Sequence, residues 1–275
     1  MQEGKIYRQI IEKIAQDGGL TFMQFDPPNY PSEAIGGIAK IAEENGIDAF
    51  AVGGSLNAQG KMLNDALKQI KENSSLPRIL FPGNISTISK HADAIYFMSM
   101  LNSNDPYWIT GAQIGSSFPV KQLGLEVIPT SYIIIEPGEA AGWMGRAQLI
   151  PRNKPYLAAA TALAGQYLGS KLIILESGGG APEPCTKEMI SATKKVLDVP
   201  LLVAGGVRTA KFAYDTIRAG ADIVQVGTAF ESDKGNLQQM AKHFKEITSA
   251  VKKAGKEKRQ WCNSAAVKKA GNEKK

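Results

Sequence analysis

Short runs of apolar and β-branched residues alternate along this chain with longer amphipathic stretches, and this alternation most limits what it can fold into. Such a pattern is typical of parallel strands connected by helices. The expected strands cover residues 20–25, 48–52, 78–81, 94–98, 131–135, 171–175, 201–203 and 223–226. Eight such units in 275 residues predict a single α/β domain, a closed (β/α)8 barrel of the TIM type.

Helices are expected between most of these strands. They cover residues 5–16, 32–45, 60–72, 105–118, 155–168, 186–197, 209–218 and 236–252. The connection after the third strand is an exception, because residues 82–93 barely hold one crossover helix. We therefore expect one outer helix to be reduced or missing there, which would leave an apolar slot. The Gly- and Pro-rich loop 136–154 is expected to be a lid over the barrel mouth.

The positive charge of the chain is concentrated at its C-terminal end. The net charge is +6, yet residues 252–275 hold nine Lys and Arg against two Glu, so the remaining residues together are slightly negative. A nucleic-acid-binding fold would spread basic residues over its surface, so we expect no nucleic-acid partner. We expect residues 1–253 to form the barrel domain and 254–275 to be a basic, mostly disordered tail. Such a tail is compatible with peripheral contact with anionic lipid headgroups.

The cysteine and histidine content excludes several classes of site. Only Cys185 and Cys262 occur, without CxxC spacing, and the only histidines are His91 and His243. A His-based zinc site and a Ser-His-Asp triad are therefore not expected. Isolated cysteines, no apolar run of the ~18 residues that a membrane span needs and no signal-peptide pattern together indicate a cytoplasmic protein.

Gly-rich turns follow each of the last three expected strands. They are residues 176–180, 204–207 and 227–229. In TIM barrels the loops after the seventh and eighth strands often hold a phosphate, and glycine lets backbone N–H groups approach the anion closely. The turns therefore predict a phosphate site at the C-terminal mouth of the barrel. The alternative is that these glycines only permit tight turns between strands and helices.

Two carboxylates are expected at the same mouth. Asp26 ends the first strand before Pro27-Pro28, and Ser55 follows two glycines after the second strand. A carboxylate, a hydroxyl and substrate phosphate oxygens suit Mg²⁺, which takes few protein ligands. Glu176 ends the sixth strand, where it could accept a proton from a substrate hydroxyl. The alternatives are a helix cap for Asp26, and a cap or a salt bridge for Glu176.

The order of these motifs resembles one enzyme family. The chain has Asp-Pro at 26–27, Gly-Gly-Ser at 53–55, Leu-Glu-Ser-Gly-Gly-Gly-Ala at 175–181, Ala-Gly-Gly-Val-Arg at 204–208 and Val-Gly-Thr-Ala at 226–229. It is similar in this to the geranylgeranylglyceryl phosphate synthases, to which the bacterial heptaprenylglyceryl phosphate synthases are related. The resemblance covers about residues 20–230. Residues 136–155 resemble the archaeal group with the longer central loop.

The resemblance implies Mg²⁺-dependent transfer of a C20 prenyl group from geranylgeranyl diphosphate to the C3 hydroxyl of sn-glycerol 1-phosphate, with diphosphate released. It implies that Asp26 and Ser55 hold Mg²⁺, that Glu176 is the catalytic base, and that the protein is a homo-oligomer. The implied substrate-binding residues are Leu175, Glu176, Ser177, Gly178, Gly179, Gly180, Ala181, Gly205, Gly206, Gly227 and Thr228. The chain departs from the family at Ile174, where a Tyr is usual, and at Pro28, where an acidic residue is usual.

Other functions stay open at this point. Another phosphate-binding TIM-barrel enzyme, either a sugar-phosphate isomerase or a flavin-dependent enzyme, would also place a phosphate after the last strands. An isomerase would need a second acidic residue late in the chain, which is not evident. A non-catalytic ligand-binding barrel is a further alternative, and Asp26→Asn would distinguish it from a catalyst.

Overall fold

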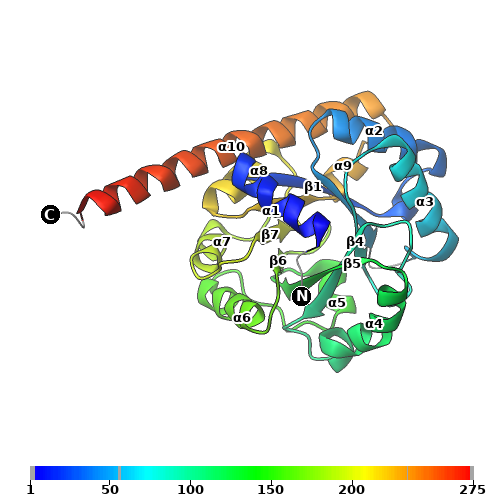
Figure 1. Cartoon of the computed structure of the whole chain (residues 1–275), viewed down its shortest axis with the longest axis horizontal. Coiled ribbons are helices and arrows are strands. Elements are labelled where there is room, and N and C mark those ends of the chain that lie inside the picture. Colours follow the sequence, from blue (N-terminus) through cyan, green and yellow to red (C-terminus); the bar gives the residue numbers. More distant parts are fainter. Residues whose placement is uncertain (1–3, 55–56, 234, 273–275) are drawn as a thin grey trace.

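The computed structural model of the chain is a closed barrel of parallel strands surrounded by helices (Figure 1). It describes residues 4–54, 57–233 and 235–272, with side chains as far as residue 260. The strands are β1 Leu20–Phe25, β2 Ala49–Gly54, β3 Arg78–Pro82, β4 Ala94–Met100, β5 Glu126–Ile134, β6 Leu172–Glu176, β7 Leu201–Ala204 and β8 Ile223–Val226. They follow in chain order, and β8 pairs with β1, with Leu20 opposite Ile223. The predicted barrel is confirmed.

Side chains alternate along the strands between two apolar layers. Phe22, Tyr96 and Ile174 point into the barrel and belong to the inner layer. Met23 and Ile173 point outward and pack in the layer beneath the helices. Because both faces of the sheet are covered, the strands read as continuous apolar runs rather than as alternating ones.

The helices lie around the outside of this sheet. They are α1 Lys5–Asp17, α2 Ile35–Glu44, α3 Gly60–Asn73, α4 Ala112–Gln122, α5 Glu139–Met144, α6 Pro155–Tyr167, α7 Lys187–Lys194, α8 Ala210–Ala219, α9 Thr228–Glu231 and α10 Leu237–Asn272. Short turns of helix add η1 Pro27–Asn29, η2 Ser32–Ala34 and the π-helical η3 Tyr107–Gly111. Threonines cap α7 and α8: the Thr186 hydroxyl accepts the Met189 N–H at 3.2 Å, and that of Thr209 accepts the Phe212 N–H at 3.1 Å.

The floor of the barrel is closed by α1. Tyr7 and Ile10 are buried in the inner apolar layer. The Glu126 carboxylate accepts the backbone N–H groups of Ile6 and Tyr7, both at 2.7 Å, and so satisfies the first turn of α1. The floor of the barrel is therefore closed to ligands. β5 begins at Glu126, five residues before the predicted strand, because Glu126 already pairs with Ala94 of β4.

The wall of the barrel is incomplete between β3 and β4. All of residues 83–93 are described, and no helix forms among them, as predicted. The two strands pair at two positions only, Ile79 with Ala94 and Leu80 with Ile95, whereas β4 and β5 pair at seven. The upper parts of β3 and β4 therefore separate, and no outer helix covers the space between them.

The long loop between β5 and α6 is an anchored cover. It contains α5, and its Gly145 carbonyl accepts the Ser103 hydroxyl at 2.6 Å. Arg146 forms a salt bridge of 3.6 Å with Asp105. Trp143 is 81% exposed, so its ring points away from the barrel. The predicted lid thus covers part of the mouth with backbone and small side chains.

The last helix continues past the residue at which the barrel domain was expected to end. Ala254 is fully buried, and a Cβ on Gly255 would lie 2.4 Å from the carbonyl oxygen of Asp17. Lys258 donates to the carbonyl oxygen of Ala221 at 2.8 Å. This differs from the expected disordered tail at 254–275, because two small residues let α10 pack closely on the floor, and the helix then runs away from the barrel (Figure 1). No helix in the described part of the chain is both long and apolar enough to cross a membrane.

Candidate active site

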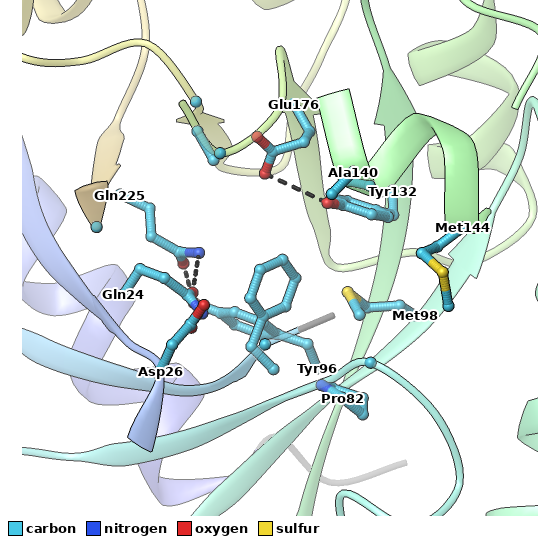
Figure 2. Close-up of a pocket in the computed structure, with 18 of the residues that line it drawn as sticks. Gln24, Asp26, Pro82, Tyr96, Met98, Tyr132, Ala140, Met144, Glu176 and Gln225 are labelled. Carbon is cyan, nitrogen blue, oxygen red and sulfur yellow. Dashed lines mark hydrogen bonds between the residues drawn. The ribbon is translucent and has the colours of Figure 1, made fainter. Parts of the chain in front are cut away.

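A cavity of about 440 Å³ occupies the mouth of the barrel. One end lies among the turns after β6, β7 and β8, and the other lies between β3, β4 and α4. Figure 2 shows Asp26 and Glu176 on separate sides of it, with Met98 and Met144 at the apolar side. The cavity therefore joins a polar end and an apolar end through a region that contains both predicted carboxylates.

Asp26 directly follows β1, and its carboxylate accepts a hydrogen bond from the Gln24 amide (Figure 2). Gln24 in turn accepts one from Gln225 at 2.8 Å, and Tyr96 donates to Gln225 at 3.4 Å. Burial raises the pKa of Asp26 to about 7, the Gln24 hydrogen bond opposes this rise, and the charge of Glu231 adds to it. A buried chain of amides therefore fixes the direction in which Asp26 faces the cavity.

Glu176 is the last residue of β6 and is only 5% exposed. It accepts the Gly178 N–H at 2.7 Å and the Tyr132 phenol at 3.3 Å (Figure 2). Burial raises its pKa to about 7, although both hydrogen bonds lower it. Ile174, which departs from the family pattern, is fully buried, and its neighbour in register on β5 is Tyr132. A phenol thus reaches Glu176 from the adjacent strand.

The Gly-rich turns bring backbone close together at the polar end. Gly205 has a φ of +78°, and a Cβ there would lie 2.5 Å from a Glu176 carboxylate oxygen. Gly206 has a φ of +73°, and a Cβ would lie 2.1 Å from the carbonyl carbon of Glu183. Both positions therefore require glycine. The predicted residues that line the cavity are Glu176, Gly179, Gly180, Gly205, Gly206, Gly227 and Thr228.

Other residues named from the sequence lie behind this lining. Leu175 points into the outer apolar layer, and Ala181 is fully buried. Ser177 is buried with its hydroxyl 3.3 Å from the Cys185 sulfur, and the Gly178 N–H is used by Glu176. These four residues support the turn rather than line the cavity. Ser55, named as a metal ligand, lies outside the described residues.

Arg208 was not assigned a role from the sequence. It lines the polar end of the cavity and donates to the carbonyl oxygen of Gly180. Within the described part of the chain it is the only basic side chain that lines the cavity. The sequence signal was its place directly after Gly-Gly-Val in the turn following β7.

The fit of a divalent metal to this site depends on Asp26. No group of three or more His, Cys, Asp or Glu among the described residues could hold a metal alone. The half-buried Asp26 carboxylate has Glu231 as a charged neighbour, and no cation contributes to its pKa. Glu231 accepts a hydrogen bond from Asn29 at 2.9 Å, and all three residues line the cavity. These oxygens suit Mg²⁺, which keeps several waters and also takes ligands from substrate phosphates.

The other end of the cavity is apolar. It is lined by Phe81, Ile85, Ile88, Ile95, Phe97, Met98, Met100, Trp108, Ala112 and Met144. Tyr96 and Met98 point into the barrel, whereas Ile95 and Phe97 pack with the outer layer. Because the lining includes residues from both faces of β4, the cavity passes through the gap between β3 and β4. This is the slot that the short connection predicted.

Comparisons with known proteins agree with this architecture. The model of the PcrB family matches residues 20–248. The geranylgeranylglyceryl phosphate synthase of Thermococcus gammatolerans is 50% identical, over 92% of this chain and 99% of the relative. That of Pyrococcus abyssi is 51% identical, over 90% and 98%. The crystal structure of the (S)-3-O-geranylgeranylglyceryl phosphate synthase of Thermoplasma acidophilum, solved with its substrate sn-glycerol-1-phosphate, superimposes with a TM-score of 0.85 at 32% identity, covering 92% of this chain and all of that one.

Proposed function

The chain belongs to the PcrB family, and we propose that it is a prenyltransferase that joins geranylgeranyl diphosphate to the C3 hydroxyl of sn-glycerol 1-phosphate. In this reaction the bond between C1 of the prenyl group and the diphosphate oxygen breaks. A bond between C1 and the C3 oxygen of the glycerol forms, the hydroxyl proton passes to a base, and diphosphate leaves. The product is an ether-lipid precursor.

One observation carries the proposal: a single cavity has a Gly-lined polar end, an apolar end and a buried carboxylate between them. The two substrates differ in the same way. The acceptor is a small polar phosphate, and the donor has a long apolar chain with a charged head. The cavity can hold the acceptor at the turns after β6–β8 and the donor chain in the slot between β3 and β4, so their reactive ends meet near Glu176.

Glu176 is the proposed base. Because burial raises its pKa to about 7, a large share of the carboxyl is ionised at neutral pH and is still basic enough to accept a proton. The Gly178 N–H and the Tyr132 phenol hold its two oxygens and leave the carboxylate facing the cavity. An apolar surrounding of this kind also keeps water away from the reacting carbon.

The turns after β6–β8 are the proposed site for the glycerol phosphate. The close approach of Gly205 and Gly206 exposes backbone to the cavity, and the turn at Gly227 and Thr228 lines the same end. Arg208 would add the one basic side chain of the described lining. An Arg donor pairs well with a phosphate oxygen. The bound sn-glycerol-1-phosphate of the Thermoplasma acidophilum structure supports this choice of acceptor.

Mg²⁺ is the proposed cofactor, and Asp26 and Ser55 are its proposed protein ligands. When bound, the ion neutralises charge on the diphosphate and so makes it a better leaving group. Gln24 and Gln225 orient Asp26 toward that position. Pro28 lines the cavity where the family usually has an acidic residue, and Glu231 supplies a carboxylate nearby instead.

We further propose a cytoplasmic homo-oligomer. Large apolar side chains are strongly exposed on α4 and α5: Ile114 by 73%, Phe118 by 75% and Trp143 by 81%. Exposed apolar patches of this kind commonly mark protein contacts. Light scattering coupled to size-exclusion chromatography should give a mass above one chain, and a monomer at micromolar concentration would contradict the oligomer.

The proposed reaction is tested by incubating the protein with sn-glycerol 1-phosphate, geranylgeranyl diphosphate and Mg²⁺, with and without EDTA. We expect a prenyl ether product that disappears with EDTA and returns when Mg²⁺ is restored. Folded protein that yields no product would contradict the assignment. Turnover of a sugar phosphate without metal would favour an isomerase, and a yellow protein would favour a flavin enzyme.

A further inference from the structure

Basic side chains gather where α10 leaves the barrel. Lys252, Lys253, Lys256 and Arg259 are exposed, whereas Ala254 among them is buried against the floor. No acidic residue of the described chain forms a salt bridge with any of these four cations. The Lys252 charge opposes the rise in the pKa of Asp48, and the Lys253 Nζ lies 5.7 Å from the centre of the Tyr214 ring, but no ion pair among the described residues neutralises these charges.

Three of these cations also surround a hollow in the surface. The space between the end of α1 and α10 measures about 400 Å³ and is lined by Gln16, Asp17, Lys252, Lys256, Arg259 and Gln260. Asp17 is the one acidic member. The hollow lies at the barrel floor, because Gly255 packs there on Gly18 and Asp17, just before β1 begins. It is thus at the opposite end of the barrel from the catalytic cavity.

The rest of the molecule has the opposite sign of charge. Residues 252–275 hold nine Lys and Arg against two Glu, while the remainder of the chain is slightly negative. The match to the family model ends at residue 248, so the basic segment lies outside the part that defines the family. A separate role for this segment, unrelated to the chemistry in the cavity, is consistent with both facts.

We propose that Lys252, Lys256 and Arg259 dock the barrel floor on an anionic lipid bilayer. Phosphate groups of lipid headgroups complement these cations, and the hollow between α1 and α10 is large enough to hold one. The choice of a bilayer as partner rests on the proposed function, since its prenyl donor and its product both partition into lipid. Docking by the floor leaves the mouth and the gap between β3 and β4 uncovered, so substrates can still enter.

The direct test is sedimentation of the full chain with vesicles of one third phosphatidylglycerol and two thirds phosphatidylcholine. We expect binding at low salt that is lost at high salt and is absent with phosphatidylcholine alone. Each basic residue near such a surface strengthens binding about fivefold, so K252E/K256E/R259E should weaken it at least about a hundredfold. A control, K61E/K154E/K187E, makes the same change in net charge at exposed lysines where α3, α6 and α7 begin, at the mouth end of the barrel, and should bind nearly as the unmodified chain does.

Three results would overturn the proposal. One is equal sedimentation with anionic and neutral vesicles, and another is equal loss of binding in the two triple variants. The third is nuclease-treated protein that binds an RNA oligonucleotide through the same residues but does not bind vesicles. Prenyl transfer is measured separately on substrates dispersed in detergent, where K252E/K256E/R259E should keep its full rate. Failure of the synthase assignment would appear in that assay alone, because vesicle binding is read without turnover.

Discussion

The two flanks of the barrel mouth differ in how closely their backbone is packed. On the flank of β6–β8, short turns hold backbone so closely that Gly205 and Gly206 have no room for a side chain. On the flank of β3 and β4, one helix is missing and the strands pair at only two positions. The first flank suits a small charged group of fixed shape, and the second suits a long apolar chain. A barrel can thus serve two unlike substrates by tightening one part of its wall and opening another.

Glu176 lies between the flanks, so changing it should have the largest effect. Glu176→Gln keeps the shape and the bond from Gly178 but cannot accept a proton, so kcat should fall about a thousandfold. KM for sn-glycerol 1-phosphate should change little, because the turns are intact. Single-turnover kinetics with both substrates saturating would measure this. A variant that retained a tenth of the rate would remove Glu176 from the role of base.

The same residue predicts the pH dependence of the reaction. Burial raises the pKa of Glu176 to about 7, so its basic form grows as the pH rises through 7 and disappears below it. We expect kcat to increase across this range and then level off, and Glu176→Gln to weaken this dependence but not remove it, because the pKa of Asp26 is also raised to about 7. A pH profile with stopped-time assays would show both. A flat profile for the unmodified enzyme would contradict the assignment.

Gly205→Ala should disturb the tight flank together with the Glu176 carboxylate beside it. The new Cβ would press on Glu176 and on the Gly178 backbone, at a φ of +78°. We expect KM for sn-glycerol 1-phosphate to rise about a hundredfold, as if two hydrogen bonds to a charged group were lost. Gly124→Ala is the matched control, because its φ is +67° and nothing lies within 4 Å of it. Steady-state kinetics on both variants would separate loss of the phosphate site from the general effect of backbone strain. An equal rise in KM for sn-glycerol 1-phosphate in the two variants would contradict the prediction.

Arg208→Gln should weaken the same flank less. Removal of the one basic side chain of the described lining should raise KM for sn-glycerol 1-phosphate about tenfold, with kcat nearly unchanged. Arg218→Gln on α8 is the control, since Arg218 lies outside the cavity lining and pairs with Glu257. Isothermal titration with sn-glycerol 1-phosphate would give the same ratio without turnover. Unchanged affinity would contradict a role for Arg208 and would show that backbone groups alone bind the phosphate.

Binding of the prenyl chain at the open flank should be weakened by a larger side chain in the slot. Ala112→Phe places a ring in the apolar end, so KM for geranylgeranyl diphosphate should rise up to about tenfold. A C10 prenyl diphosphate and sn-glycerol 1-phosphate should be nearly unaffected, because neither reaches that end. Ala160→Phe, at an exposed position of α6, is the control. Equal effects on C10 and C20 donors would show that the chain does not occupy the slot.

The tight flank could be predicted from the sequence because its signals are local. A Gly-rich turn directly after an apolar run is expected at the C-terminal mouth of the barrel, and its glycines predict a phosphate site there. The open flank was predicted only by length, since twelve residues barely hold one crossover helix, while its lining by Phe97 and Trp108 depends on packing between distant segments. Arg208 and the amides Gln24 and Gln225 were missed, because their roles arise from contacts with neighbouring strands and turns that are far apart in the sequence or lie in another loop.

The floor shows the same limit. Residues 126–130 were not assigned to a strand, since Glu126 and Pro129 interrupt the apolar pattern, yet Glu126 is the group that caps α1. The end of the barrel domain was placed at residue 253 from charge, whereas the close packing of Ala254 and Gly255 decides where α10 leaves the barrel. A count of charges describes a segment's solubility and says little about its contacts.

The short pairing of β3 and β4 has a consequence for the order of events after catalysis. Backbone hydrogen bonds join each pair of neighbouring strands in a closed sheet. The pairing between β3 and β4 covers far fewer positions than the pairing between β4 and β5. Local opening costs least where few bonds must break, so the amide hydrogens between β3 and β4 should exchange fastest among the strands. A product with a long apolar tail can then leave sideways while the phosphate turns stay rigid. The barrel would release its product by a local separation of β3 and β4. The two strands would then pair again before the next turnover, and the rest of the sheet would stay intact.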